Sequence, residues 1–364
     1  MAETERNIPD GYNFAEFPIV PDLDENIENI RNILGGSSDL LVNPITICGV
    51  RAAVLCFEGM VSGLNTVHMV IRPLTEIRIE NCTSEKLFSH IHNNMIISVD
   101  SAVSVKYGDI IRRLMSGFAV ILVNGIGKAI CGGIQGYAMR AVKEPSTEGN
   151  IRGAHEGFVE IVRTNMSLIR RRLKSPYYVQ KLGVIGDASQ TDICLCYMSD
   201  RVPQKLIDRI YRSIDKIRLE SVFSTGYIKP FLEPKKKRIF SSVGMTERPD
   251  VLCSKLIEGR VALLIDGNPY ALYIPKLVTD NFQTLDDYNF KPYFGTFIRI
   301  LKYTAFLLAL LLPAVYTAIA MHHPEMLNST LLMILVDSEK NAPFSIAAEI
   351  SSACSAMVTP MLEP

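Results

Sequence analysis

LMSGFAVILVNGIGKAI at residues 114–130 and LIEGRVALLIDGNPYAL at residues 256–272 share one pattern at an offset of 142 positions. In each stretch, a run rich in Val, Ile and Leu precedes a small polar residue and a glycine, the pair that a tight hairpin turn favours. These pairs are Asn124-Gly125 and Asp266-Gly267. Each stretch therefore predicts a strand that turns back into a second strand.

The residues around each stretch extend the resemblance. A helix-like segment precedes the first strand and closes at Gly117 or Gly259, because glycine adopts the positive φ at which helices end. The helix-like segments are 109–115 and 250–257, and the returning strands are 128–134 and 270–274. Upstream, the strand-like runs are RAAVLCF at 51–57 and DICLCY at 192–197, the second followed by a helical stretch over 202–217.

This repeat predicts an α/β (α+β) soluble N-terminal region of two similar subdomains with mixed sheets. The expected bounds of the subdomains are 39–145 and 181–283. A polar N-terminal segment, 1–38, comes first and contains one candidate helix over 24–34, which Gly35-Gly36 would end.

An amphipathic helix is expected between the subdomains, within a linking segment at 146–180. In FVEIVRTNMSLIRRRL at 158–173, one helical face is formed by Phe158, Ile161, Val162, Asn165, Leu168, Ile169 and Leu173. Arg163, Arg170 and Arg171 fall largely on the other faces. Two roles are open for these arginines: an interface between copies of the chain, or a brace between the two halves of one chain.

An uncharged apolar run of 19 residues extends from Tyr303 to Met321. As a helix rising about 1.5 Å per residue it would reach roughly 28 Å, close to the hydrocarbon thickness of a bilayer. Pro313 near its middle predicts a kink, which membrane helices tolerate when neighbouring helices satisfy the freed carbonyl. Arg299 and Lys302 precede the run, so the positive-inside tendency places the soluble region in the cytoplasm.

A second, partial membrane segment is expected over 344–362. It contains Glu349, and an ionisable residue at membrane depth is a functional candidate by default. With the full span at 303–321, this segment makes 284–364 a partial all-α transmembrane domain.

Composition argues against several classes of protein. Lys plus Arg equals Asp plus Glu at 38 each, so no basic excess points to nucleic acid. The polar N-terminus has no secretory signal pattern, and the eight cysteines show no CxxC spacing. No nucleophile, paired-carboxylate, phosphate-loop or metal-ligand pattern stands out, so we expect no enzyme activity and no catalytic, cofactor-binding or metal-binding residues. The basic run KKKR at 235–238 contacts anionic lipid headgroups or forms a solvated loop.

Short motifs follow one another along the chain. They are Glu156-Gly157-Phe158, RTNMSLIRRRLK at 163–174, TGYI at 225–228, Thr246-Glu247-Arg248-Pro249-Asp250, Glu258-Gly259-Arg260-Val261-Ala262, Asp266-Gly267-Asn268-Pro269, Asp286-Asp287-Tyr288 and His323-Pro324-Glu325-Met326. In these motifs the chain resembles the GerA family, the A subunits of bacterial spore germinant receptors.

The resemblance implies a cytoplasm-facing α/β region of two subdomains followed by a membrane domain in the spore inner membrane. It further implies partnership with an integral-membrane B subunit, a lipoprotein C subunit and other A subunits. Such a complex responds to nutrients, and ion release starts germination. Family A subunits continue through further membrane helices, whereas this chain ends at Pro364, within its second membrane segment. The chain is therefore expected to be truncated in the membrane domain.

Three hypotheses follow. The leading one is an A subunit that couples nutrient sensing by its partner subunits to ion release. The alternative is a truncated, membrane-anchored interaction module that modulates full-length receptor subunits. The third, an unrelated α/β enzyme with a tail anchor, rests on fold class alone.

Overall fold

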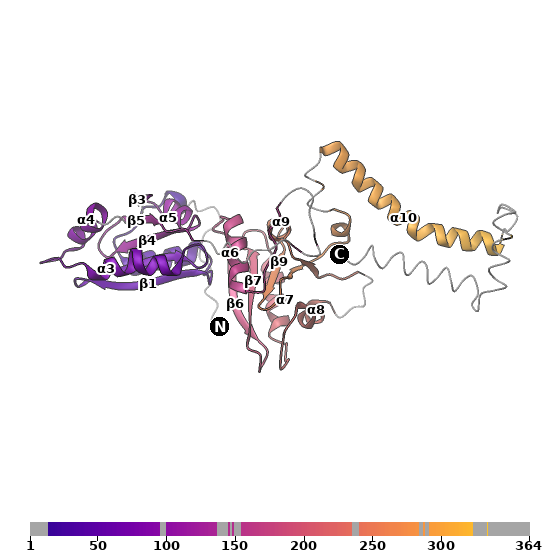
Figure 1. Cartoon of the computed structure of the whole chain (residues 1–364), viewed down its shortest axis with the longest axis horizontal. Helices are drawn as coiled ribbons and strands as arrows, with labels where there is room; N and C mark the ends of the chain where they lie inside the picture. The colour runs from indigo at the N-terminus through magenta and orange to yellow at the C-terminus, as the bar shows by residue number, and fades with distance from the viewer. Residues whose placement is uncertain are drawn as a thin grey trace. The chain divides into compact units, whose positions relative to one another are not determined.

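The computed structural model describes residues 14–94, 100–136, 145, 148, 154–234, 240–283, 287, 291–322 and 333. These residues form two bodies, and each is considered by itself (Figure 1). The first body contains two β-sheets and ends at Pro275, and the second begins at Lys276. Within the first body, we call residues 14–136 lobe 1 and residues 154–275 lobe 2.

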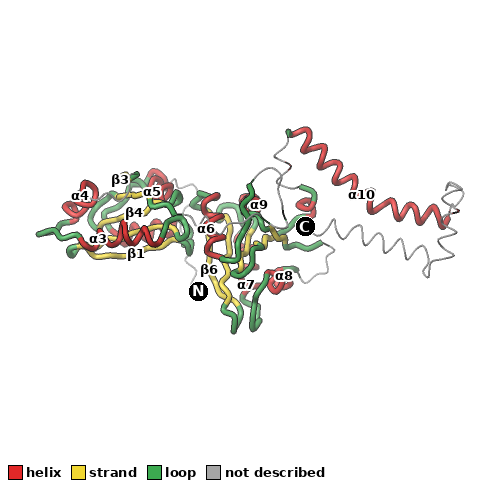
Figure 2. The backbone as a smooth tube through the Cα atoms, in the orientation of Figure 1, coloured by secondary structure: helices red, strands yellow, loops and turns green. Residues whose placement is uncertain are grey.

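Lobe 1 is a five-stranded sheet in the order β1-β2-β4-β5-β3, covered by helices on both faces (Figure 2). Its strands are β1 (Leu40–Ile47), β2 (Val50–Phe57), β3 (Ser101–Ser104), β4 (Phe118–Val123) and β5 (Ala129–Gly133). One face packs against α1 (Leu23–Ile33) and α5 (Tyr107–Leu114). The other packs against η2 (Thr66–Ile71), α3 (Arg72–Glu76) and α4 (Ser84–Asn94). Short helical turns at η1 (Phe14–Glu16) and α2 (Gly63–Asn65) complete the lobe.

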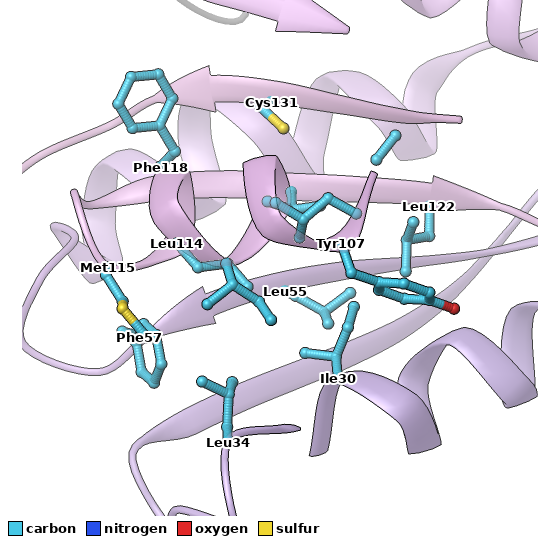
Figure 3. Packing of buried hydrophobic residues seen from close by; sticks show 14 of the residues in the cluster. Ile30, Leu34, Leu55, Phe57, Tyr107, Leu114, Met115, Phe118, Leu122 and Cys131 are labelled. Atoms are coloured by element: carbon cyan, nitrogen blue, oxygen red, sulfur yellow. The ribbon is translucent and has the colours of Figure 1, made fainter. Parts of the chain in front are cut away.

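The core of lobe 1 follows from strand geometry, in which successive side chains point to opposite faces. On β2, Leu55 and Phe57 enter the core under α1 and α5, while Val54 and Cys56 enter the core on the other side. Figure 3 shows Leu55 beside Ile30 of α1 and Phe57 beside Met115. Because both faces are covered, the strand reads as a continuous apolar run rather than an alternating one.

Lobe 2 repeats this plan with a sheet in the order β6-β7-β9-β10-β8. Its strands are β6 (Tyr178–Ile185), β7 (Thr191–Met198), β8 (Gly244–Thr246), β9 (Val261–Ile265) and β10 (Ala271–Ile274). One face packs against α6 (Val162–Arg172) and α9 (Pro249–Ile257), and the other against α7 (Gln204–Ile214) and α8 (Thr225–Leu232).

All the strand pairings of both sheets in the described chain are antiparallel, so the expectation of mixed sheets is wrong in that detail. The reason is the position of β3 and β8 at the outer edge of each sheet. The helix after each edge strand carries the chain back to β4 or β9, and β5 or β10 lies between these two strands. The strands joined by a helix are therefore not neighbours, and no parallel ladder forms between them.

The repeat begins earlier in each lobe than the sequence pattern indicates. In lobe 1, the Asn26 side chain bonds both backbone groups of Val20, with N···O distances of 3.2 Å and 2.6 Å. In lobe 2, the Asn165 side chain bonds Val159 in the same way, at 2.8 Å and 2.6 Å. Both asparagines lie in the first turns of the corresponding helices, α1 and α6. The helix expected over 158–173 therefore begins at Val162 and is the counterpart of α1.

The polar residues of the Asn124-Gly125 and Asp266-Gly267 pairs bond the first helix of their lobes. Asn124 Oδ1 accepts a hydrogen bond from the Leu23 amide at 3.2 Å, and Asp266 Oδ1 accepts one from the Val162 amide at 2.9 Å. Each side chain satisfies an amide at the helix N-terminus that has no partner within the helix. The strand bounds make the β4–β5 and β9–β10 connections longer than a two-residue turn. The polar residue of each connection, Asn124 or Asp266, anchors the first helix of its lobe.

The second body consists mainly of α10 (Pro292–His322), preceded by η3 (Val278–Asn281). Within α10, Pro292–Tyr316 is long and apolar enough to cross a membrane. Pro313 lies inside the helix, and Figure 1 shows α10 changing direction along its length, as a proline in a helix interior causes. The predicted span from Tyr303 to Met321 lies within α10, whereas Glu349 and the segment 344–362 lie outside the described residues.

Two basic residues of α10, Arg299 and Lys302, pair with a carboxylate that precedes the helix in the sequence. Asp287 has a nearly buried carboxylate that pairs with Lys302 at 3.1 Å and with Arg299 at 3.4 Å. The Tyr303 ring stacks on Phe282 with the ring centroids 4.6 Å apart. The two cations that precede the predicted span therefore also hold Asp287 against α10.

Candidate functional site

The first polar cluster in the body is centred on Arg170 of α6, whose side chain is buried. Its guanidinium forms a two-pronged ion pair with Asp39 of lobe 1, with Nε–Oδ2 at 2.7 Å and Nη2–Oδ1 at 3.1 Å. Bidentate pairs of this kind are the strong, geometrically specific ones. Arg170 therefore joins the two lobes through a fully desolvated charge pair.

The remaining groups of the guanidinium also find partners. Nη1 donates to the Tyr178 carbonyl at 3.0 Å, and Nη2 donates to Ser37 Oγ at 3.0 Å. The guanidinium lies 4.5 Å from the ring centroid of Tyr178 and 4.7 Å from that of Phe57, one ring from each lobe. Since a cation over desolvated aromatic rings gains further attraction, the site is built for a permanent charge.

Further hydrogen bonds extend this contact between the two lobes, which we call the joint, along β6, the edge strand of the lobe 2 sheet. The Ser38 amide donates to the Gln180 carbonyl at 2.8 Å, and the Gln180 amide donates to Ser37 Oγ at 3.0 Å. Lys181 Nζ donates to the Gly36 carbonyl at 2.6 Å. An exposed edge strand invites pairing with other chains, and here lobe 1 covers part of that edge.

Two contacts complete the joint beside Asp39. Arg163 pairs with Glu58 at 2.6 Å, and both side chains are partly exposed. Gly59 follows Glu58 with φ at +73°, and a Cβ atom on it would lie 2.5 Å from Ser167 Cβ of α6. Glycine at this position lets the β2 end of lobe 1 approach α6 closely.

The repeat itself shows what the joint adds to the fold. Ile30-Arg31 of α1 and Ile169-Arg170 of α6 occupy corresponding places, 139 positions apart. Arg31 is exposed, whereas Arg170 is buried. The fold of one lobe does not bury this arginine. Arg170 is buried because lobe 1 docks on lobe 2. This contact corresponds to a brace between the two halves of one chain, which is one of the two roles that the sequence left open.

Glu156 forms a second cluster with the end of α6. Its carboxylate accepts hydrogen bonds from Arg171 Nη2 and Arg172 Nη2, each with an oxygen at 2.6 Å. Burial opposes the charged form of Glu156, but the hydrogen bonds and positive charges of Arg171 and Arg172 outweigh it and lower the pKa below its ordinary value. Cations in the last turn also interact favourably with the helix dipole, so this cluster fixes the C-terminal end of α6.

Replacing Glu156 with Gln is expected to flatten the loss of stability in acid. The pKa is depressed in the folded chain, so the stabilisation is present above the unfolded value of 4.5 and is lost as pH falls through the folded pKa. Urea midpoints of the chain in detergent micelles, measured from about pH 7 to about pH 3, test this. An acid limb as steep in Glu156→Gln as in the unchanged chain would contradict it.

The other motif residues lie around α9 and the strands it covers. Glu247 accepts a hydrogen bond from the Phe158 amide at 2.7 Å through its carbonyl, and Arg248 pairs with Asp250 at 2.8 Å. Thr246 Oγ1 donates to the Glu148 carboxylate at 2.6 Å, and burial, the largest effect, raises the pKa of Glu148. Pro249 begins α9, Gly259 lies just beyond its end, and Gly157 is buried before Phe158. Glu258 pairs with Arg260 at 2.7 Å. Gly267 lies in the β9–β10 turn, where its amide donates a hydrogen bond to the Glu160 carbonyl.

The arrangement brings together some predicted site residues and leaves others apart. Arg163 and Arg170 lie at the joint, Arg171 lies with Glu156, and Asp266 and Asn165 hold the start of α6. Sequence reasoning missed the lobe 1 half of the joint, above all Asp39. It lies 131 positions from Arg170, and no local spacing signals that pair.

Comparison with known proteins identifies the family. Residues 28–357 match the family described as the Bacillus/Clostridium GerA spore germination protein. The chain belongs to this family. It is 32% identical over 336 residues to spore germination protein KA of Bacillus subtilis, which covers 91% of this chain and 61% of that protein. It is 29% identical over 322 residues to spore germination protein GerLA of Bacillus cereus, covering 88% and 65%. The chain thus spans less than two thirds of the length of these relatives.

A solved structure confirms the predicted fold of two similar α/β subdomains. It is the crystal structure of the N-terminal domain of the A subunit of the Bacillus megaterium spore germinant receptor GerK3. The TM-score is 0.56 at 24% identity, and the match covers 72% of this chain and 97% of that one. The likeness concerns the fold, and it places this GerA-family chain among proteins with the same two-sheet body.

Proposed function

We propose that this GerA-family chain is an A subunit of a nutrient germinant receptor and acts without catalytic chemistry. In this proposal it lies in the spore inner membrane and assembles with other A subunits and with B and C subunits. It couples nutrient sensing by these partners to ion release. The single observation that carries the proposal is the family match over residues 28–357, which includes lobe 1 from within α1 onward, all of lobe 2 and α10.

The joint suggests how the body would take part. A soluble region that passes a signal to a membrane segment has to move as a unit, because independently moving lobes would dissipate a displacement. The buried pair between Asp39 and Arg170 couples lobe 1 to lobe 2. Lobe 2 leads through residues 275–291 into α10. In this proposal, the joint therefore makes the two lobes move as one rigid body.

The orientation rests on charge. Arg299 and Lys302 of α10 precede the uncharged run from Tyr303 to Met321, which is long enough to cross a bilayer. The positive-inside tendency supports an orientation with the two-lobed body on the cytoplasmic side, which in this proposal is the spore core. Protease added from outside would leave the body intact in this orientation and would degrade it in the opposite one.

Gene deletion in a strain without redundant receptors tests the function. Nutrient-triggered germination should be lost, while germination by agents that bypass receptors should continue. Complementation with the unchanged gene and with the Arg31→Ala variant should restore the response, because Arg31 lies on the exposed face that corresponds to the joint. Unchanged nutrient germination in the deletion strain would contradict the proposal.

A further inference from the structure

Apart from the partly exposed Lys229, helix α8 (Thr225–Leu232) of lobe 2 carries no charged residue, and apolar side chains lie on both of its faces. Thr225, Ile228 and Leu232 point into the core under the sheet. The outward face is made by Phe223, which precedes the N-cap Ser224, and by Gly226, Tyr227, Pro230 and Phe231. A surface helix of a soluble protein normally turns polar residues to water, so an apolar outward face indicates that something covers it.

The exposure of this face is substantial. Phe223 is 67% exposed, Tyr227 48% and Phe231 39%. A Cβ atom added to Gly226 would meet no atom within 4 Å, so the surface beside the aromatic residues is open. Tyr227 and Phe231 are four residues apart, which places them one above the other on the helix. In Figure 1, α8 lies with α7 on the lobe 2 sheet.

The sequence around α8 is basic in a chain whose net charge is zero. Residues 212–238 contain eight Lys and Arg against three Asp and Glu, a net charge of +5. Four of the eight are the KKKR run at 235–238, which begins three positions after α8 in the sequence and lies outside the described residues. Positive charge near exposed aromatic side chains is the combination found in segments that lie in the interface of anionic membranes. A protein partner for an apolar helix would not require this charge, whereas anionic headgroups would attract it.

We propose that the outward face of α8, formed by Phe223, Gly226, Tyr227, Pro230 and Phe231, docks on the surface of an anionic phospholipid bilayer. The aromatic rings enter the boundary between headgroups and acyl chains, and the net positive charge of the sequence around α8 favours an anionic surface. This inference rests on the proposed membrane attachment through α10 and adds a second, peripheral contact to it.

The covalent connection makes a weak contact sufficient. Between β10, which ends at Ile274, and α10, which begins at Pro292, the chain has 17 residues, 275–291. Even fully extended, they span at most about 60 Å. A tethered surface meets the bilayer at a high effective concentration, so three aromatic side chains hold it without the affinity that a free peripheral protein needs.

Tryptophan fluorescence tests the inference directly, because the chain contains no Trp. The full chain is reconstituted into vesicles of phosphatidylcholine and phosphatidylglycerol with either ordinary or brominated acyl chains. Single reporters replace Tyr227 or Phe231 with Trp. Tyr177→Trp on the same lobe is the matched control, because Tyr177 is 44% exposed and lies outside α8.

Emission from Tyr227→Trp and Phe231→Trp should shift to the blue and should be quenched by brominated lipid. Tyr177→Trp should show neither effect, and pure phosphatidylcholine should weaken the quenching at both α8 positions. Equal quenching at the three positions would overturn the inference. A blue shift without bromolipid quenching would also overturn it and would indicate that protein covers α8.

Alkaline extraction of the same vesicles separates this inference from the proposed function. If the chain stays in the vesicle fraction and the α8 reporters are not quenched, the α8 contact is wrong while attachment through α10 stands. If the chain is released by extraction, attachment through α10 is wrong, and the inference that rests on it fails as well.

Discussion

Replacement of Asp39 with Ala is expected to lower the free energy of unfolding by about 3–5 kcal/mol, because it leaves the buried Arg170 charge without its carboxylate. The guanidinium keeps its hydrogen bond to Tyr178 O, but the two bonds to Asp39 are lost in a site closed to water. Urea unfolding of the full chain in detergent micelles measures the effect.

The repeat supplies the matched control for this prediction. Arg31 occupies in α1 the place of Arg170 in α6, and it is exposed, so Arg31→Ala should change the free energy by about 0.5 kcal/mol or less. The double variant Asp39→Ala with Arg170→Met removes both charges and should be less destabilised than Asp39→Ala alone. If Asp39→Ala proved as mild as Arg31→Ala, the buried pair would not hold the lobes together.

The central hairpins and their preceding helices could be predicted because their signals are local. The apolar runs before Asn124 and Asp266 became β4 and β9, and the helices predicted at 109–115 and 250–257 became α5 and α9. In each case, a few consecutive residues carry both the apolar pattern and the turn chemistry. The first helix of each lobe was also expected, although its membership of the repeat was not.

The strands β1, β3, β6 and β8 were not predicted, and their sequences explain why. β3 and β8 are short edge strands of 4 and 3 residues, SAVS and GMT, and such segments have too few residues to show a period. β1 contains Pro44, which lowers the strand signal and fits an edge position, where β1 lies. β1 and β6 form by pairing with β2 and β7, and β3 and β8 form by pairing with β5 and β10. These pairings are tertiary contacts that no local pattern signals.

The candidate site also has one part that the sequence signals locally and one part that it does not signal. Arg163, Arg170 and Arg171 attracted interest because arginines on one amphipathic helix are visible in the sequence. Their carboxylate partners are not visible, since Glu58 lies 105 positions from Arg163 and Asp39 lies 131 positions from Arg170. The choice between a brace and an interface depended on those partners, so only coordinates could place Arg170 inside the chain.

Replacement of Gly59 with Ala is expected to destabilise the joint from two causes. The backbone has φ at +73°, which costs a residue with a Cβ about 1–2 kcal/mol. The added Cβ would also lie 2.5 Å from Ser167 Cβ, and relieving such an overlap by backbone shifts costs about 1–3 kcal/mol more. The free energy of unfolding should therefore fall by about 2–5 kcal/mol in urea titrations of the full chain.

Two comparisons isolate the contact between the lobes from the strain within lobe 1. Gly49 has φ at +85° with nothing within 4 Å of an added Cβ, so Gly49→Ala reports the backbone strain alone. In a Ser167→Gly background, the overlapping atom is gone, and the cost of Gly59→Ala should fall to that of Gly49→Ala. If the cost of Gly59→Ala were the same with and without Ser167, the two residues would not be in contact, and the close approach of β2 to α6 would be wrong.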